Sequence, residues 1–303
     1  MSKLILLLCI TGILLGQAHA KLGQSVVVTY KKHNEDVNVV GLKSEGIYHF
    51  NSAAEKQITL ATLDWPPYIS EQLCDGGWVF QLAVSLFHAA GYGVKIEFLP
   101  WARAVRKVEQ GEYDVLFPEY FIEARAPSDN FTNTKRRDLL ELSQAFPGGN
   151  ISFMKLKGTP DNFEGDLAYM LGKDVGVVRG YQNTKEFDAM MDSGKFNIVE
   201  AVDDLQQVRL LFAKRVNFII GDPMVIESVI MLAPDIPLMQ KHRMIRNLEE
   251  VKPEIQYNPL YFAVSKRKAN WQTTLSDINQ EISHFEQHNA FELLIERSKQ
   301  ACL

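Results

Sequence analysis

From residue 58 onward, apolar and polar positions alternate between the two spacings that strands and helices produce. Short apolar runs at 58–63, 94–98 and 113–117 predict three strands. Each gap between these runs carries apolar residues three and four positions apart, which predicts a helix. Three strands joined through two helices predict a parallel sheet with right-handed crossovers.

The same alternation returns in the second half of the chain. Strand candidates occur at 151–156, 174–178, 196–199 and 216–220, with helix candidates at 181–191, 204–214 and 223–232. A further strand at 260–264 precedes closing helices at 271–286 and 290–299. Two α/β units of about a hundred residues each match the usual size of a domain better than one large sheet. We therefore expect two lobes with a ligand cleft between them.

The start of the chain does not follow this alternation. Lys3 is followed by the apolar run Leu4–Leu15, and the small residues Ala18 and Ala20 come shortly after it. The apolar run is too short to span a bilayer. This order predicts a secretory signal peptide over residues 1–20, cleaved after Ala20, and a periplasmic mature protein.

An N-terminal extension separates the predicted signal peptide from the first strand of the α/β pattern. Within residues 21–57, alternating runs at 25–30 and 37–42 flank a polar stretch. Such a pair of runs predicts a β-hairpin. The sequence indicates no function for this hairpin.

Charge and cysteine content narrow the class of protein. The chain has 32 Lys and Arg against 37 Asp and Glu, a net charge of −5. This acidic balance argues against a nucleic-acid partner. After signal cleavage the cysteines are Cys74 and Cys302, which could form a disulfide in an oxidising compartment or remain two unrelated thiols.

Motifs for metal binding or nucleophilic catalysis are weak in this sequence. His284 and His288 stand one helical turn apart, a spacing that zinc sites use, but the glutamate between them is not where a zinc protease needs it. We interpret the pair as a solvated helix face and predict no metal site and no cofactor. The sequence contains no Ser-His-Asp, nucleophile-elbow or phosphate-loop pattern, which disfavours hydrolase and kinase functions.

The first predicted strand runs directly into Asp64-Trp65-Pro66-Pro67-Tyr68. Each proline fixes its own φ at about −65° and drives the preceding residue toward an extended conformation, so this linker cannot fold back as a helix. One interpretation is a strand terminator whose rings pack into the core. The linker also lies at the carboxyl end of a parallel strand, where open α/β sheets bind ligands, and this favours a ligand-binding role.

Several motifs occur in an order and spacing that resemble a known family. They are Leu99-Pro-Trp-Ala-Arg-Ala104, Gly111-Glu-Tyr-Asp114, Thr134-Lys-Arg-Arg137 before Leu140-Glu-Leu-Ser143, and the segments 172–180 and 215–222. With the 64–68 linker, they make residues 58–300 similar to the periplasmic solute-binding proteins of the polar amino-acid type, family 3 of the extracellular solute-binding proteins. The resemblance implies a two-lobed type II periplasmic-binding fold, in which each lobe is a mostly parallel sheet flanked by helices.

The resemblance also implies how the chain divides. Lobe 1 would comprise residues 58–146 and 260–303, and lobe 2 residues 148–256, with crossings near 147–149 and 257–259. A two-stranded crossing permits hinge closure around a ligand. We expect a monomer.

By resemblance, Arg136 holds the carboxylate of the ligand and Asp222 holds its α-ammonium group. A guanidinium matches a carboxylate through two parallel hydrogen bonds, which Lys135 could not reproduce. The alternatives are that Arg136 is an exposed member of a basic run and that Asp222 is a helix N-cap before Pro223.

The resemblance assigns Trp65, Tyr68 and Trp78 to the stacking surface for the ligand, and we add Asp64 from the same linker. Trp101 at helix spacing is more typical of a core residue. The chain departs from the family at Tyr181-Gln182, where small hydroxyl residues are usual, and in a longer loop that carries Glu119 near the cleft. We include Tyr181 and Glu119 among the candidate ligand contacts.

The leading hypothesis is a periplasmic protein that captures a small polar, amino-acid-like solute for an ABC-type transporter in the membrane. One rival is an enzyme similar to cyclohexadienyl dehydratases, which share the fold, with Glu119 as general acid. A second rival is a sensory protein that presents its ligand to a membrane receptor.

Family architecture also returns the carboxyl-terminal helices to the lobe that carries Cys74, which implies a disulfide between Cys74 and Cys302.

Overall fold

The computed structural model describes residues 24–32 and 35–301. The predicted signal peptide and Cys302 lie outside the described residues, so the cleavage and the Cys74–Cys302 pair stay predictions. Cys74 itself is disulfide-bonded. Among the helices that the structure describes, none is long and apolar enough to cross a membrane.

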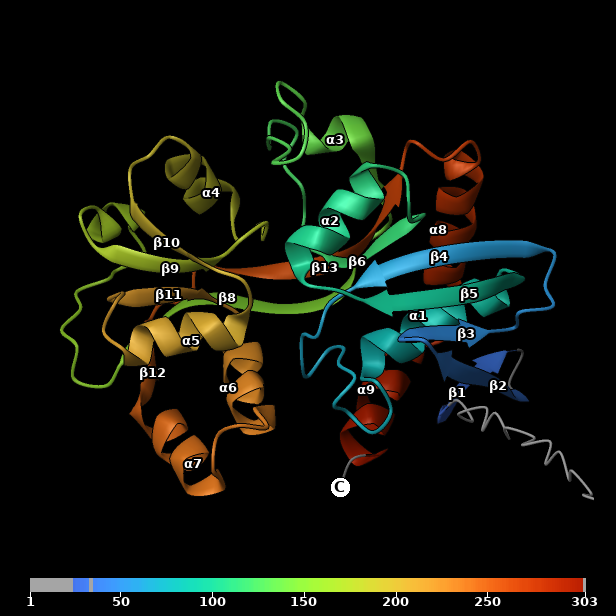
Figure 1. The fold of residues 1–303 in the computed structure, drawn as a ribbon, viewed down its shortest axis with the longest axis horizontal. Coiled ribbons are helices and arrows are strands. Elements are labelled where there is room, and N and C mark those ends of the chain that lie inside the picture. Colours follow the sequence, from blue (N-terminus) through green and yellow to red (C-terminus); the bar gives the residue numbers. More distant parts are fainter. Residues whose placement is uncertain (1–23, 33–34, 302–303) are drawn as a thin grey trace, which may run out of the picture.

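Lobe 1 is built around three parallel strands joined by helices (Figure 1). Its central strands are β4 (Lys56–Thr62), β5 (Tyr92–Phe98) and β6 (Val115–Glu119), and β4 is parallel to the other two. The connecting helices are α1 (Trp78–Ala89) and α2 (Trp101–Glu109). The parallel arrangement predicted from the apolar pattern is confirmed.

The predicted hairpin forms and joins the sheet of lobe 1. Strands β1 (Gln24–Lys32) and β2 (Glu35–Ser44) are antiparallel, and a third strand, β3 (Ile47–Phe50), follows. Because β3 pairs with β5, the extension adds its strands to one edge of the sheet. The sequence did not predict β3, since four residues are too few to establish a period. The ring of Phe50 anchors β3 by packing edge-on against Phe80.

Lobe 2 repeats the alternation of strands and helices. Its parallel strands are β9 (Asp174–Val178), β10 (Asn197–Ala201) and β11 (Phe218–Gly221), and the helices α4 (Lys185–Asp192), α5 (Asp204–Phe212) and α6 (Pro223–Leu232) follow them in turn. A short 3-10 helix, η1 (Leu167–Met170), precedes β9. The apolar pattern did not predict α7 (Leu238–Asn247) or β12 (Leu248–Glu250). Helix α7 buries only Met244, so its apolar period is weak.

Two long strands connect the lobes. Strands β8 (Phe146–Leu156) and β13 (Gln256–Ser265) pair antiparallel with each other over the middle of the molecule (Figure 1). Beyond this ribbon, β13 pairs with β6 in lobe 1 and β8 pairs with β11 in lobe 2. The strands therefore form one continuously paired sheet, although they divide into two lobes. The expected crossings at 147–149 and 257–259 fall inside the ribbon, and the lobe boundaries stay a prediction.

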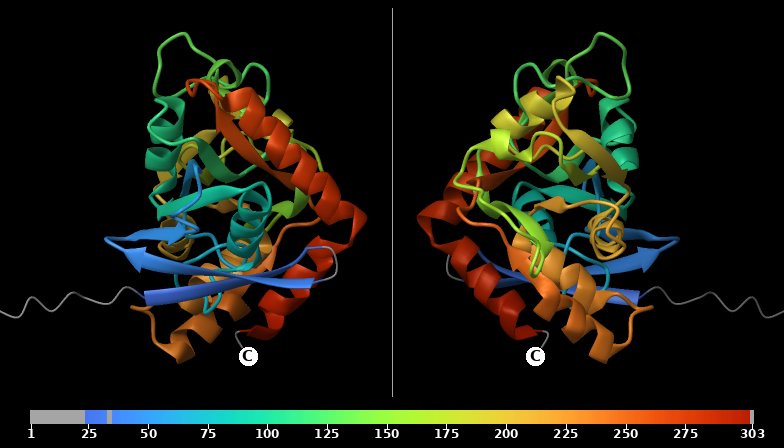
Figure 2. Two further views of the ribbon diagram at one scale, coloured as in Figure 1. Left: turned by 90° about the vertical axis from the view of Figure 1, so that its right-hand side faces the viewer. Right: turned by 90° about the vertical axis from the view of Figure 1, so that its left-hand side faces the viewer.

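The last elements return to lobe 1. After the short α3 (Arg136–Leu139), strand β7 (Leu140–Leu142) pairs with β13. Helices α8 (Trp271–Gln287) and α9 (Ala290–Ala301) both contact α1, and α9 lies beside the β1–β2 hairpin (Figure 2). The C-terminal helices and the N-terminal extension are therefore neighbours in lobe 1.

Candidate functional site

The linker after β4 forms a tight turn at the boundary between the lobes. Trp65 and Ile69 exchange backbone hydrogen bonds across the two prolines. Asp64 is exposed, and its Oδ1 accepts hydrogen bonds from the Ser70 hydroxyl and the Glu71 amide at 2.8 Å each. The Asp64 carboxylate therefore stabilises the turn, and the structure does not bring it to the cavity that the neighbouring rings line.

The predicted aromatic residues do gather at this boundary. The rings of Trp65 and Tyr68 stack with their centroids 4.5 Å apart. The ring centroid of Trp78 lies 6.1 Å from the ring centroid of Tyr68. Tyr120, which follows Glu119 and is not among the predicted contacts, packs edge-on against Trp65 with the ring centroids 5.6 Å apart. All four side chains are buried. The rings are therefore packed, as the alternative interpretation held, but they pack where the two lobes meet.

Tyr68 of lobe 1 bonds directly to Asp222 of lobe 2. The Tyr68 hydroxyl donates to Oδ2 of Asp222 at 2.7 Å, and Oδ1 accepts from the amide of Met224 at 2.8 Å, so Asp222 also caps helix α6. Burial raises the pKa of Asp222, and burial with the nearby Asp222 charge raises the pKa of Tyr68. Gly149 makes the contact possible, because a Cβ at this position would overlap both oxygens.

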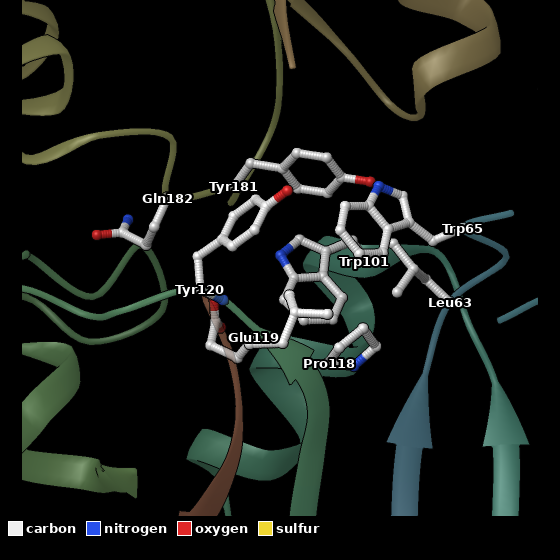
Figure 3. A pocket seen from close by; sticks show the side chains of 9 residues that line it. Leu63, Trp65, Trp101, Pro118, Glu119, Tyr120, Tyr181 and Gln182 are labelled. Atoms are coloured by element: carbon white, nitrogen blue, oxygen red, sulfur yellow. The ribbon is translucent and has the colours of Figure 1, made fainter. Parts of the chain in front are cut away.

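A small pocket lies beside these rings (Figure 3). We call it the aromatic cavity; it is lined by Leu63, Trp65, Trp101, Pro118, Glu119, Tyr120, Tyr181, Gln182 and Leu260. Tyr181 and Gln182 come from lobe 2 and the others from lobe 1 or the ribbon. Its volume of about 20 Å³ is enough for roughly one water molecule.

Trp101 and Tyr181 hold the two walls of the aromatic cavity together. The indole Nε1 of Trp101 donates to the carbonyl of Gly180 across the lobes at 2.9 Å, and the rings of Trp101 and Tyr181 meet edge-on at 6.0 Å. The Tyr181 hydroxyl donates to Oδ2 of Asp204 at 2.8 Å. Burial raises the pKa of Asp204 to about 7. Sequence reasoning did not select Asp204, although it begins a predicted helix after a strand of lobe 2.

Arg136, to which the resemblance gives the ligand's carboxylate, is buried and paired with two glutamates. Its Nη2 lies 2.7 Å from Oε2 of Glu119 and its Nε lies 3.3 Å from Oε1 of Glu109, and only 4% of its side chain is exposed. Two of its nitrogens are therefore engaged inside the protein, which contradicts the alternative of an exposed basic run, and the contact of Arg136 with a ligand carboxylate stays a prediction. Arg137 instead pairs with Glu141 near the surface.

Two buried polar atoms of this region have no hydrogen-bond partner within the described part of the chain. They are Nη1 of Arg136 and the hydroxyl of Tyr120. A buried donor without an acceptor costs free energy, so such groups in a native structure call for an explanation. A ligand acceptor would satisfy either atom. Burial also raises the pKa of Glu119, against the lowering effect of Arg136.

A larger hollow opens between the lobes next to the aromatic cavity. This polar hollow has a volume of about 370 Å³ and shares Tyr181 and Gln182 with the smaller space. Arg136 and Glu109 line its lobe 1 side, and the segment around Gly180 lines its lobe 2 side. A volume of this order falls within the usual range for small-molecule sites.

The histidine pair behaves as a solvated helix face. His284 on α8 and His288, the residue after this helix, are both exposed, and Nδ1 of His288 lies 2.7 Å from the carbonyl oxygen of His284. Within residues 24–32 and 35–301, no group of three or more His, Cys, Asp and Glu side chains could hold a metal ion.

No family model matches the sequence, and no curated protein sequence matches it. Solved structures do match. An ancestral arginine-binding protein bound to arginine has 17% identity and a TM-score of 0.62, and the match covers 80% of this chain and 98% of that chain. A histidine kinase sensor domain with similarity to periplasmic binding proteins has 16% identity and a TM-score of 0.63, covering 81% and 96%.

A third similar structure is AbpA of Streptococcus pneumoniae, an amino acid ABC transporter substrate-binding protein bound to L-arginine. It has 14% identity and a TM-score of 0.61, and the match covers 82% of this chain and 96% of that chain. At these identities the likeness establishes a shared fold. The chain has the two-lobed type II fold of periplasmic binding proteins, as its motifs predicted.

Proposed function

We propose that this protein is a periplasmic solute-binding protein that encloses a small polar, amino-acid-like solute between its lobes for an ABC-type transporter. The observation that carries the proposal is the meeting of Tyr68 from lobe 1 with Asp222 from lobe 2, beside buried aromatic rings. Asp222 is the residue to which the family resemblance gives the ligand's ammonium group. The similarity to amino-acid-binding proteins of the same fold supports this function.

Binding of an amino acid beside Trp65 and Tyr120 requires the lobes to separate. The aromatic cavity, at about 20 Å³, cannot admit an amino acid while the lobes touch. The contacts that join the lobes include the bonds from Tyr68 to Asp222 and from Trp101 to Gly180, and the edge-on packing of Trp101 against Tyr181. A ligand that bonds to both lobes would replace these contacts and favour the closed arrangement, because only the closed state offers both sets of partners.

The charges around the site favour a ligand with a positive group. Glu109, Glu119, Asp204 and Asp222 are buried there, while Arg136 is the buried cation among them. Aromatic faces add an attraction for cations when water is excluded. The unpartnered Nη1 of Arg136 then offers a single bond to the ligand's carboxylate in place of a bidentate clamp. A basic amino acid combines these features, and two of the similar structures hold arginine.

We propose binding in preference to catalysis. A general acid must deliver a proton to its substrate, which the dehydratase alternative assigns to Glu119. That carboxylate is only 2% exposed, and it accepts hydrogen bonds from Arg136 and from the amide of Tyr120. Incubation of the protein with prephenate or arogenate, followed by mass spectrometry, should leave both compounds unchanged. Conversion at a rate proportional to enzyme concentration would favour the dehydratase alternative.

A sensory role is the second candidate, and the similarity to a histidine kinase sensor domain supports it. Deletion of the gene separates the two roles. Loss of uptake of the labelled ligand by the deletion strain would indicate transport. Unchanged uptake with a lost transcriptional or motile response to the ligand would indicate sensing.

The test of binding is a thermal-shift screen of amino acids and amines with the mature protein, starting with arginine, followed by calorimetric titration. A ligand at 100 times its dissociation constant should stabilise the fold by about 2.7 kcal/mol. Asp222→Asn keeps the helix cap but removes the charge, so it should weaken binding at least tenfold. Asp235→Asn is the control, because Asp235 is an exposed lobe 2 carboxylate paired with Arg209. No shift with any solute, or equal affinity for both variants, would contradict the proposal.

A further inference from the structure

Two features of the sequence have no role in the interlobe site, namely the N-terminal hairpin and the pair His284 and His288. The structure brings them together on lobe 1. Strand β1 and helices α8 and α9 surround a hollow with a volume of about 690 Å³, which we call the hairpin hollow. It shares no lining residue with the aromatic cavity or the polar hollow. It is therefore separate from the interlobe site.

The floor of the hairpin hollow is apolar. The rings of Tyr30 and Phe285 stack with their centroids 6.3 Å apart, and Leu293 on α9 contributes an aliphatic side chain that is 46% exposed. The hydroxyl of Tyr30 lies 2.9 Å from Nδ1 of His88, so it already has a partner outside the hollow lining. Tyr30 and Phe285 are buried, so Leu293 is the exposed part of this aromatic and aliphatic floor.

The rim of the hairpin hollow is basic. Lys31 and Lys32 are exposed at the end of β1, and neither forms an ion pair with another described residue. Glu281 is the carboxylate among the lining residues that the structure describes, and it lies 3.4 Å from Nδ1 of His284. Across the hairpin, Asp36 stands opposite Lys31 and Glu35 stands opposite Lys32 in the strand register.

The hollow has a fixed wall between the hairpin and α9. Nη1 of Arg297 donates to the carbonyl of Thr29 at 3.3 Å, and Nη2 lies 3.5 Å from a carboxylate oxygen of Asp36. Lys32 also donates to the carbonyl of Ala89 on α1 at 3.3 Å. These bonds tie the extension to helices α9 and α1, both in lobe 1.

We propose that the hairpin hollow binds an amphipathic anion, with its acidic group at Lys31 and Lys32 and its apolar tail on Tyr30, Phe285 and Leu293. The ammonium groups of the two lysines attract the acidic group of the anion. Transfer of the apolar tail from water onto the apolar floor of the hollow is favourable through the hydrophobic effect. The anion is a carboxylate or phosphate amphiphile, either free in solution or as the head group of an anionic lipid. This binding is independent of the solute between the lobes.

Sodium octanoate is the probe for this proposal, measured by calorimetric titration of the mature protein at moderate salt. We expect octanoate to bind and octylammonium, which has the same tail and the opposite charge, to bind at least tenfold more weakly. The double variant Lys31→Glu/Lys32→Glu should weaken octanoate binding at least tenfold. Leu293→Gln should weaken it several-fold, since it removes only part of the apolar floor.

The matched control is Lys185→Glu/Lys195→Glu, which makes the same change of charge at two exposed lysines of lobe 2. It should bind octanoate as the unmodified protein does. Equal binding of octanoate and octylammonium, or an equal loss in both double variants, would overturn the proposal, as would an absence of octanoate binding. Thermal unfolding of each variant checks that the fold is retained.

Vesicles distinguish the two sources of the anion. Sedimentation with phosphatidylcholine vesicles that contain phosphatidylglycerol, in amounts that fall with Lys31→Glu/Lys32→Glu, identifies a lipid head group as the ligand. Octanoate binding without sedimentation identifies a free amphiphile. Sedimentation that the lysine variant does not change, with no binding of octanoate, would refute a site at the hairpin hollow.

Discussion

The hydroxyl of Tyr68 lies 2.7 Å from Oδ2 of Asp222, and this hydrogen bond joins the two lobes at the centre of the candidate site. Tyr68 follows the two prolines after β4, whereas Asp222 stands at the end of β11 and caps α6. The residue that we propose for the ligand's ammonium therefore has a partner in the closed protein. A bound ligand and the Tyr68 hydroxyl would compete for the same oxygen.

Replacing Tyr68 with Phe should destabilise the closed protein. The change removes a hydrogen bond to a buried carboxyl group, and bonds to charged groups contribute about 1.5 to 3 kcal/mol. We expect a lower midpoint in urea unfolding with an unchanged dependence on urea concentration. Tyr257→Phe is the comparison, because the Tyr257 hydroxyl bonds to the amide of Gly148 on an exposed edge. Similar small losses for both variants would show that the Tyr68 bond contributes little.

Replacing Arg136 with Ala should strongly destabilise the fold. The change leaves the buried carboxylates of Glu109 and Glu119 without their cation, and breaking a buried ion pair in this way costs about 3 to 5 kcal/mol. Arg137→Ala removes a partly exposed pair with Glu141 and should cost under about 1 kcal/mol. Chemical denaturation of both variants measures the difference. If the two variants are equally stable, the buried pairs do not form in solution.

Gly149→Ala should prevent complete closure of the lobes. A Cβ at Gly149 would overlap Oδ2 of Asp222 and the hydroxyl of Tyr68, and neither group can move far inside the closed site. We expect a larger radius of gyration by small-angle X-ray scattering and weaker binding of the screened ligand. In the control Gly221→Ala, the new methyl would meet its nearest neighbour, Ile226, at an ordinary 3.5 Å. A closed, fully active Gly149→Ala protein would contradict the role of this glycine.

The stability of the protein should fall as the pH rises from about 5 to about 7.5. Burial raises the pKa of Asp188 and of Asp204 from the ordinary 3.8 to about 7 in the folded chain. Between pH 3.8 and about pH 7 the folded state therefore binds more protons than the unfolded state. The free energy of unfolding is then highest at low pH and decreases as the pH rises through about 7. Melting temperatures measured across this range test the expectation.

Asp204→Asn isolates one of the two groups. An amide cannot titrate, but its oxygen can still accept the bond from Tyr181. The decrease in melting temperature with pH should become smaller in this variant and remain partly in place because of Asp188. An unchanged pH dependence would mean that Asp204 titrates near its ordinary pKa.

The sequence predicted most of the regular elements because their signals are local. The apolar runs of β4 and β5 and the helix spacing of α1 lie within short stretches, so no distant partner is needed to recognise them. The capping role of Asp222 before Pro223 was likewise visible as one of two interpretations, since a cap depends on the next few residues. Strand β3 and helix α7 escaped notice because one is too short and the other too polar to show a period.

The family motifs predicted the type II fold, and the similar solved structures agree with it. They did not predict the surroundings of the candidate residues. Asp64 has the turn-forming role of a loop residue, and Arg136 is buried where the family pattern implied an accessible clamp. A motif identifies a position along a family alignment, whereas the partners of a side chain depend on residues outside the motif.

The sequence by itself determined the order of strands and helices, the stiffness of the linker that carries Trp65 and Tyr68, and the hairpin before the first lobe. Only the tertiary structure decided that Glu109 and Glu119 occupy two nitrogens of Arg136, and that Tyr68 reaches Asp222. Secondary structure follows from periodicity over a few residues. Ion pairs between residues far apart in the chain depend on which faces of the strands and helices meet when the chain packs. Burial then makes each pair necessary, because a charge that is removed from water without a partner of opposite charge destabilises the fold.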